Sequence, residues 1–173
     1  MGPLIKSNFD SNNYNENILC LSKHINAPIL ADSCSNIRSI TSSNIISNYN
    51  YFRDNIYNQF ESIIRFGSKP VSKYLNSLID ANETYLIDPF GRFNDDANHI
   101  IKSDYKSFCN DIITNSKPIA SSSLLENFVK LDEQIKKQLN NKIIIELECE
   151  DNLISLLFKD HGRVDNIFIG NSK

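Results

Sequence analysis

Apolar residues recur at helical spacing in two stretches of the chain. Over residues 42–66, bulky apolar side chains follow one another at alternating steps of four and three residues. That spacing places them along one side of an α-helix, so it predicts a long helix there. A second stripe, with a Ser123–Glu126 capping box at its start, predicts a helix over 123–139. We expect both stripes to face the protein core.

The middle of the chain predicts shorter elements. Apolar spacing over residues 71–79 predicts a helix, and the β-branched and aromatic run at 84–87 predicts a strand. The sequence Asp-Pro-Phe-Gly at 88–91 is typical of a type I turn, which would close a short hairpin near 84–93. The pattern from Asn94, a predicted helix cap, through His99 to Ile112 indicates a further helix.

The first part of the chain is less regular. Residues 1–16 are polar and predict a flexible N-terminal tail. Two short apolar segments follow, at 18–25 and 29–40; the first allows a helix or a strand, and the second is spaced more like a helix.

The last thirty residues change character. From residue 145, apolar side chains alternate with glutamates, and two further apolar runs at 153–159 and 163–169 follow turn residues. This pattern predicts a three-stranded antiparallel meander over 142–170. The sequence as a whole therefore predicts an α+β fold in a single domain, 17–173. About four to five helices over 17–140 would pack on the apolar face of the meander.

Charge, cysteines and glycines limit the function classes. The chain has 173 residues, a net charge of −3 and no basic run longer than two residues, so we expect no nucleic-acid partner. No apolar run reaches the roughly 18–20 residues that span a bilayer, and no secretory signal is recognisable, so we expect a cytoplasmic protein without a membrane partner. The four cysteines form no metal-binding pair, and no glycine-rich phosphate loop occurs. We therefore predict no cofactor and no metal.

Asp95 and His99 are the first candidates for chemistry. Four residues apart on a predicted helix, they would share one face and could meet a metal ion. A metal site needs at least three ligands, and no second cluster of histidine or cysteine lies nearby in the sequence. We prefer a structural interpretation, in which the aspartate sits in the first turn of a helix and the histidine on its flank.

Acidic residues near the C-terminus are the second candidate. Glutamates spaced by two residues would project from one face of a strand, and further charges follow at the predicted turns. Such carboxylates could bind a metal ion, but a solvated or docking face is the simpler interpretation. A local negative surface would attract a partner protein with a basic surface. The residues predicted to bind that partner are Glu146, Glu148, Glu150, Asp151, Asp160 and Arg163.

No assembled set of catalytic residues is recognisable, so the sequence predicts a small, soluble, non-enzymatic protein that binds another protein. Immunity or antitoxin-like inhibitors have these general properties, and so do subunits of larger complexes; homo-oligomerisation is left open. The alternative hypothesis is a metal-dependent hydrolase or nuclease that uses Glu146, Glu148 and Asp160, or Asp95 and His99.

Overall fold

The computed structural model describes residues 11–52, 60–91 and 97–145. The chain divides into two compact units, Met1–Glu133 and Gln134–Lys173. The fold below is that of the first unit. Of the second unit, the structure describes the end of one helix.

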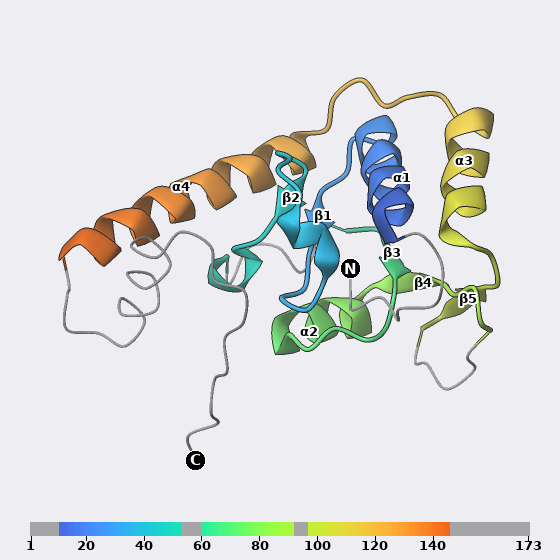
Figure 1. Cartoon of the computed structure of the whole chain (residues 1–173), viewed down its shortest axis with the longest axis horizontal. Helices are drawn as coiled ribbons and strands as arrows, with labels where there is room; N and C mark the ends of the chain where they lie inside the picture. Colours follow the sequence, from blue (N-terminus) through green and yellow to red (C-terminus); the bar gives the residue numbers. More distant parts are fainter. Residues whose placement is uncertain (1–10, 53–59, 92–96, 146–173) are drawn as a thin grey trace, which may run out of the picture. The chain divides into compact units, whose positions relative to one another are not determined.

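The described strands form two small sheets, and every pair in them is parallel (Figure 1). Strand β1 (Ile29–Leu30) pairs with β2 (Ile45–Ile46). Strand β4 (Glu83–Ile87) lies between β3 (Ser62–Phe66) and β5 (His99–Ile101). Phe66 is in register with Ile87, and Ile87 with Ile101. The carboxyl ends of β3, β4 and β5 therefore meet at one edge of their sheet.

Helices connect and flank these strands. The α-helices are α1 (Ser11–His24), α2 (Lys73–Ala81), α3 (Tyr105–Asn115) and α4 (Ser123–Ile145). Two short 3₁₀ helices, η1 (Asn36–Ser39) and η2 (Tyr49–Tyr51), follow β1 and β2 in the chain. Helix α2 crosses from β3 to β4, the connection that a parallel pair requires.

Helix ends are fixed by side-chain caps. The Leu75 N–H donates to the Ser72 hydroxyl at the start of α2, and the Ser107 N–H donates to Asp104 Oδ1 at the start of α3. This bond and the Ser107 hydroxyl hold the pKa of the Asp104 carboxyl below its usual value. Residues 11–16, which we expected in a flexible tail, belong to α1.

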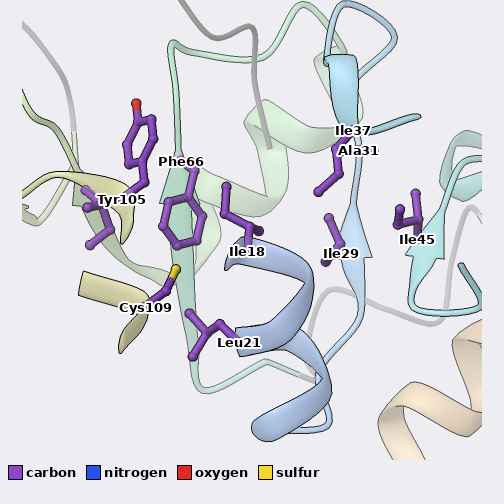
Figure 2. Close-up of a cluster of buried hydrophobic side chains, with 10 residues drawn as sticks. Ile18, Leu21, Ile29, Ala31, Ile37, Ile45, Phe66, Tyr105 and Cys109 are labelled. Atoms are coloured by element: carbon purple, nitrogen blue, oxygen red, sulfur yellow. The ribbon is translucent and has the colours of Figure 1, made fainter. Parts of the chain in front are cut away.

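The core lies between α1, α3 and the strands (Figure 2). Figure 2 shows the Phe66 side chain of β3 between Ile18 of α1 and Tyr105 of α3. Phe66 makes edge-to-face contacts with Tyr105 and Phe108, with ring centroids 5.6 and 6.0 Å apart. Such contacts add to the free energy gained by burying the rings. Phe66 therefore joins β3 to α3.

The prediction of an α+β fold with a C-terminal antiparallel meander is wrong. The described strands lie earlier in the chain and run parallel, because a helix or a longer segment, not a tight turn, separates each from its partner. Residues 142–145, predicted to open the meander, end α4. The rest of that segment, 146–170, lies outside the described residues.

The predicted helix over residues 42–66 is also wrong. Its described residues contain β2, η2 and β3. Both residues of β2 are buried, and strands buried on both sides read as continuous apolar runs without a two-residue alternation. The steps of four and three between the bulky residues run across two strands and a 3₁₀ helix. The helical interpretation of that spacing therefore failed.

Other predicted elements fare better. The helix at 71–79 and the strand at 84–87 are confirmed as α2 and β4, and α4 begins at Ser123 as expected. Ser122 supplies its cap, because the Leu125 N–H donates to the Ser122 hydroxyl. The predicted helix through His99 is wrong at its start, since His99 lies on β5 and α3 begins at Tyr105. Residues 92–96, including Asn94, lie outside the described residues.

The Phe66 contacts predict a large effect on stability. We expect Phe66→Ala to lower the free energy of unfolding by about 3–5 kcal/mol, because a buried ring and its aromatic contacts are lost. Urea denaturation of the chain measures this. Phe90→Ala is the matched control, because the Phe90 side chain is 48% exposed. Equal midpoints for the two variants would contradict the packing described here.

Candidate functional site

The carboxyl ends of the parallel strands are the first place to look for a functional site. In open sheets of parallel strands, ligands bind at this edge, where loops leave the strands. Here the loops contain Asp32 after β1, Ser47 and Asn48 after β2, Gly67 after β3 and Asp88 after β4. Gly67 has a φ of 84°, a conformation that glycine adopts without steric cost, so the chain can turn directly from β3 toward α2.

Asp32 joins the two sheets at this edge. Its side chain is fully buried, and its Oδ1 atom accepts a hydrogen bond of 3.0 Å from the Cys34 N–H. Its Oδ2 atom accepts bonds of 2.9 and 3.0 Å from the N–H groups of Val71 and Ser72, at the start of α2. A helix N-terminus attracts anions. At α2 the chain's own carboxylate occupies that position.

Polar and aromatic side chains surround Asp32. The Ser72 hydroxyl donates to Asn50 Oδ1 at 3.0 Å, and the buried Tyr49 ring stacks on Tyr74 with centroids 6.0 Å apart. Burial raises the pKa of the Tyr49 hydroxyl above its ordinary value, and the negative charge of Asp32 raises it further. The Tyr49 hydroxyl therefore stays protonated, and the site presents no phenolate near neutral pH.

Two more buried aspartates bind loop backbone at the ends of strands. Asp132, on α4, accepts bonds at Oδ1 from the N–H groups of Ser47 and Asn48, at 3.1 and 2.8 Å. Asp88 Oδ1 accepts the Phe90 N–H at 3.2 Å, and its own N–H donates to the Ile101 carbonyl. Each of the three carboxylates thus holds a loop in place.

A cavity of about 270 Å³ lies among α1, α2, β1 and β3. Its walls are mainly apolar, like those of most small-molecule sites, although its volume is at the lower end of their range. The hydroxyl of Ser22, one of its polar side chains, donates to the Ala27 carbonyl. The lining residues are Ile18, Leu21, Ser22, Ile25, Ala27, Pro28, Ile29, Leu30, Phe60, Ser62, Ile63, Ile64, Arg65, Phe66, Pro70, Leu75, Leu78, Ile79 and Leu124.

His99 lies on a strand, in a cluster that the sequence did not predict. Its Nε2 atom is 2.9 Å from Glu83 Oε1, and its ring stacks on Tyr85 with centroids 4.5 Å apart. The bonds from His99 and Tyr85 lower the pKa of the Glu83 carboxyl. A lowered carboxyl pKa contributes stability above the ordinary pKa of the group, and that stability is lost as the pH falls through the lowered value. Asp95 lies outside the described residues.

The predicted partner-binding residues stay a prediction. Glu146, Glu148, Glu150, Asp151, Asp160 and Arg163 all lie outside the described residues. Within residues 11–52, 60–91 and 97–145, no group of three or more histidine, cysteine or acidic side chains could hold a metal ion. In the same ranges, no helix combines the length and apolar character needed to cross a membrane.

Sequence reasoning missed Asp32 and Asp132. An aspartate directly after the apolar run Ile29–Ala31 was a usable signal, because aspartate side chains often bind nearby loop backbone. Asp132 lies on α4 and is only 3% exposed. Its position four residues after the buried Phe128 was the signal for burial.

The hydrogen bonds of Asp32 predict that its removal lowers the free energy of unfolding. We expect Asp32→Ala to lower the free energy of unfolding by roughly 3 kcal/mol or more, because three N–H groups lose their acceptor. Asp80→Ala is the matched control, since Asp80 is an exposed aspartate on α2. The measurement is urea denaturation at neutral pH. A difference between the two variants within about 0.5 kcal/mol would show that Asp32 does not join the sheets.

The Cys34 and Cys109 thiols should differ in how fast they react with an alkylating reagent. Burial raises the pKa of the Cys109 thiol to about 12, whereas Cys34, beside Asp32, is exposed. At pH 8 only about one Cys109 in ten thousand would be a thiolate, the reactive form. We expect iodoacetamide to label Cys34 in the folded protein and Cys109 only after unfolding, as read by peptide mass spectrometry. Equal labelling of both in the folded protein would contradict the described core.

Comparisons with known proteins place the chain beside a class of enzymes. No protein-family model matches it. It is 30% identical over 171 residues to the 2-succinyl-5-enolpyruvyl-6-hydroxy-3-cyclohexene-1-carboxylate synthase of Lactococcus lactis subsp. cremoris (strain SK11), a match that covers 92% of the chain. The synthases of the same name from Lactococcus lactis subsp. lactis (strain IL1403) and Bacillus pumilus (strain SAFR-032) are 29% and 28% identical, over 98% and 91% of the chain.

These matches show that the prediction of a non-enzymatic binding protein is wrong. All three relatives are synthases, so they support neither an immunity protein nor the alternative of a hydrolase or nuclease. The prediction failed because it took the lack of a recognisable catalytic set for the lack of an enzyme. The matches cover 30%, 31% and 29% of the three synthases. The chain thus spans about 30% of the length of the curated relatives that it matches.

Proposed function

We propose that this chain forms one part of a synthase that makes 2-succinyl-5-enolpyruvyl-6-hydroxy-3-cyclohexene-1-carboxylate. The observation that carries the proposal is the match to three such synthases over more than 90% of the chain. Because a match of that extent takes in nearly all of the described helices and strands, the shared feature is a folded unit and not a short motif. The remaining length of the synthase would supply the other parts of the enzyme.

Within such a synthase, we assign the chain a role in shaping the enzyme. The buried carboxylates of Asp32 and Asp132 accept hydrogen bonds from backbone N–H groups of the chain itself. A carboxylate that is occupied in this way holds loops rigidly and is a poor candidate for proton transfer to a substrate. The geometry of the described residues therefore supports a scaffold whose loops are held in fixed positions. The reacting groups would come from the remaining length of the synthase.

A chimaeric enzyme tests this function. In the Lactococcus lactis strain SK11 synthase, the matching segment would be replaced by this chain. We expect the chimaera to form the 2-succinyl-5-enolpyruvyl-6-hydroxy-3-cyclohexene-1-carboxylate product at a rate within about tenfold of the parent, a change of about 1.4 kcal/mol in transition-state stabilisation. We expect the chain alone to form none. Product formation is followed by mass spectrometry.

Two controls make the result decisive. A chimaera with the matching segment of the Bacillus pumilus synthase, joined at the same positions, establishes that the exchange itself is tolerated. A parent that lacks the segment establishes that the segment is needed. The proposal fails if the Bacillus chimaera is active while the chimaera with this chain folds, by circular dichroism, and forms no product.

A further inference from the structure

Helix α4 runs from the first compact unit of the chain into the second. It extends from Ser123 to Ile145, whereas the first unit ends at Glu133. Figure 1 shows it as one continuous helix, and its sequence contains neither proline nor glycine, at which helices often kink. A stiff helix transmits a tilt at one end to the other. The contacts of its first half therefore set the direction of its far end.

Three side chains on one side of α4 are buried. Leu125, Phe128 and Asp132 are 9%, 1% and 3% exposed, at helical spacings of three and four. Every described side chain over 133–141 is exposed or half-buried, so Asp132 is the last buried position in the described part of the helix. The Phe128 ring packs against Phe52 and Phe60, with ring centroids 5.7 Å apart in both pairs. Apolar packing of this kind is non-directional, so it keeps the helix close without fixing its angle.

The Asp132 carboxylate holds α4 through directional bonds. Its Oδ1 atom accepts the Ser47 N–H at 3.1 Å, and the N–H and Nδ2 of Asn48 at 2.8 and 3.2 Å. Hydrogen bonds weaken steeply away from their preferred angles, so three of them on one atom resist rotation of the helix. Because Ser47 and Asn48 directly follow the buried strand β2, these bonds tie the direction of α4 to the small sheet. A leucine at this position would bury apolar surface without the cost of desolvating a charge, but it would not supply that direction.

We propose that Asp132 is a positioning residue of the synthase, which sets the direction of α4 and thereby the place of the polypeptide joined to its far end. This inference rests on the proposed function. Asp132 does not react with a substrate, because its carboxylate is buried and bonded to the chain itself. It acts through α4 on the alignment of reacting groups elsewhere in the enzyme. A misplacement of about 1 Å can lower the rate of an enzyme by about a hundredfold, so a change in the direction of this helix affects catalysis.

The first measurement reads the direction of α4 in the full chain. Two spin labels, introduced by Asn110→Cys on α3 and Asn140→Cys on α4, give a distribution of separations by pulsed electron–electron double resonance. Both positions are exposed, so the labels do not disturb the core. Cys109 is buried and stays unlabelled. The other native cysteines are replaced beforehand, as Cys20→Ser, Cys34→Ser and Cys149→Ser.

We expect Asp132→Leu to broaden this distribution or to shift its centre, because the helix keeps an apolar contact and loses its directional bonds. Asn140 lies about 12 Å along the helix axis from Asp132, so a tilt of about 15° moves the label by about 3 Å. Asp132→Asn, which retains an acceptor oxygen, should restore most of the original distribution. Asn48→Ala removes only the Nδ2 donor, so its effect should be smaller than that of Asp132→Leu.

Two controls separate direction from stability. Glu133→Leu makes the same kind of change one residue further along α4, at an exposed position, and should leave the distribution unchanged. Ile87→Ala removes a fully buried side chain of β4 and lowers stability while the Asp132 bonds remain. We expect the distribution of the Ile87→Ala variant to match that of the unmodified chain.

The second measurement is the rate of the chimaeric synthase described above. We expect Asp132→Leu to lower its kcat by about tenfold or more, because the reacting groups are then misaligned. The KM values should change by less than about twofold, since substrate binding is not altered. Glu133→Leu should leave both constants unchanged.

The outcomes separate the two proposals. An active chimaera whose kcat is unchanged by Asp132→Leu overturns this inference and leaves the proposed function standing. A distance distribution that Asp132→Leu leaves unchanged, or that Ile87→Ala alters equally, also overturns it. If Asp132→Leu fails to fold by circular dichroism, Asp132→Asn and Asn48→Ala decide, and unchanged distributions in both overturn the inference. An inactive unmodified chimaera beside an active Bacillus control overturns both proposals.

Discussion

The hydrogen bonds of the Asp32 carboxylate hold the architecture together. The two sheets share no strand, and β1 is only two residues long, so strand pairing alone cannot connect them. Asp32 supplies the connection, because it follows β1 and accepts the N–H groups of Val71 and Ser72 after β3. Its negative charge also compensates the positive end of α2. Asp32 thus ties the loop after β1 to the start of α2, beside a core in which Ile29 and Phe66 from the two sheets are buried together.

This arrangement also limits what the edge can do. In many parallel-stranded domains the helix N-terminus at the carboxyl edge is free to bind a ligand anion. Here an internal carboxylate has taken that place, and Asp132 and Asp88 hold the neighbouring loops in a similar way. These hydrogen bonds hold the loops after the strands in place. The N-terminus of α2 is therefore not open to a phosphate group.

The sequence predicted local structure well where one segment determined its own fold. Helix α2 and strand β4 were predicted within a few residues, because capping, apolar spacing and β-branched residues agree there. Prediction failed over 42–66, where two short strands and a 3₁₀ helix imitate a helical stripe, and at His99, whose place on β5 depends on pairing with Tyr85. The Asp32 site could not be predicted, since it joins residues about forty positions apart in the sequence.

The failed prediction of function has a related physical cause. A search for motifs assumes that a chain carries its own reacting groups, but a part of a larger enzyme can hold none and still be needed for catalysis. The composition of such a part is that of any folded domain, so composition alone does not identify it. In this chain Tyr51, Val71 and Phe90 remain exposed on loops that buried polar bonds hold in place.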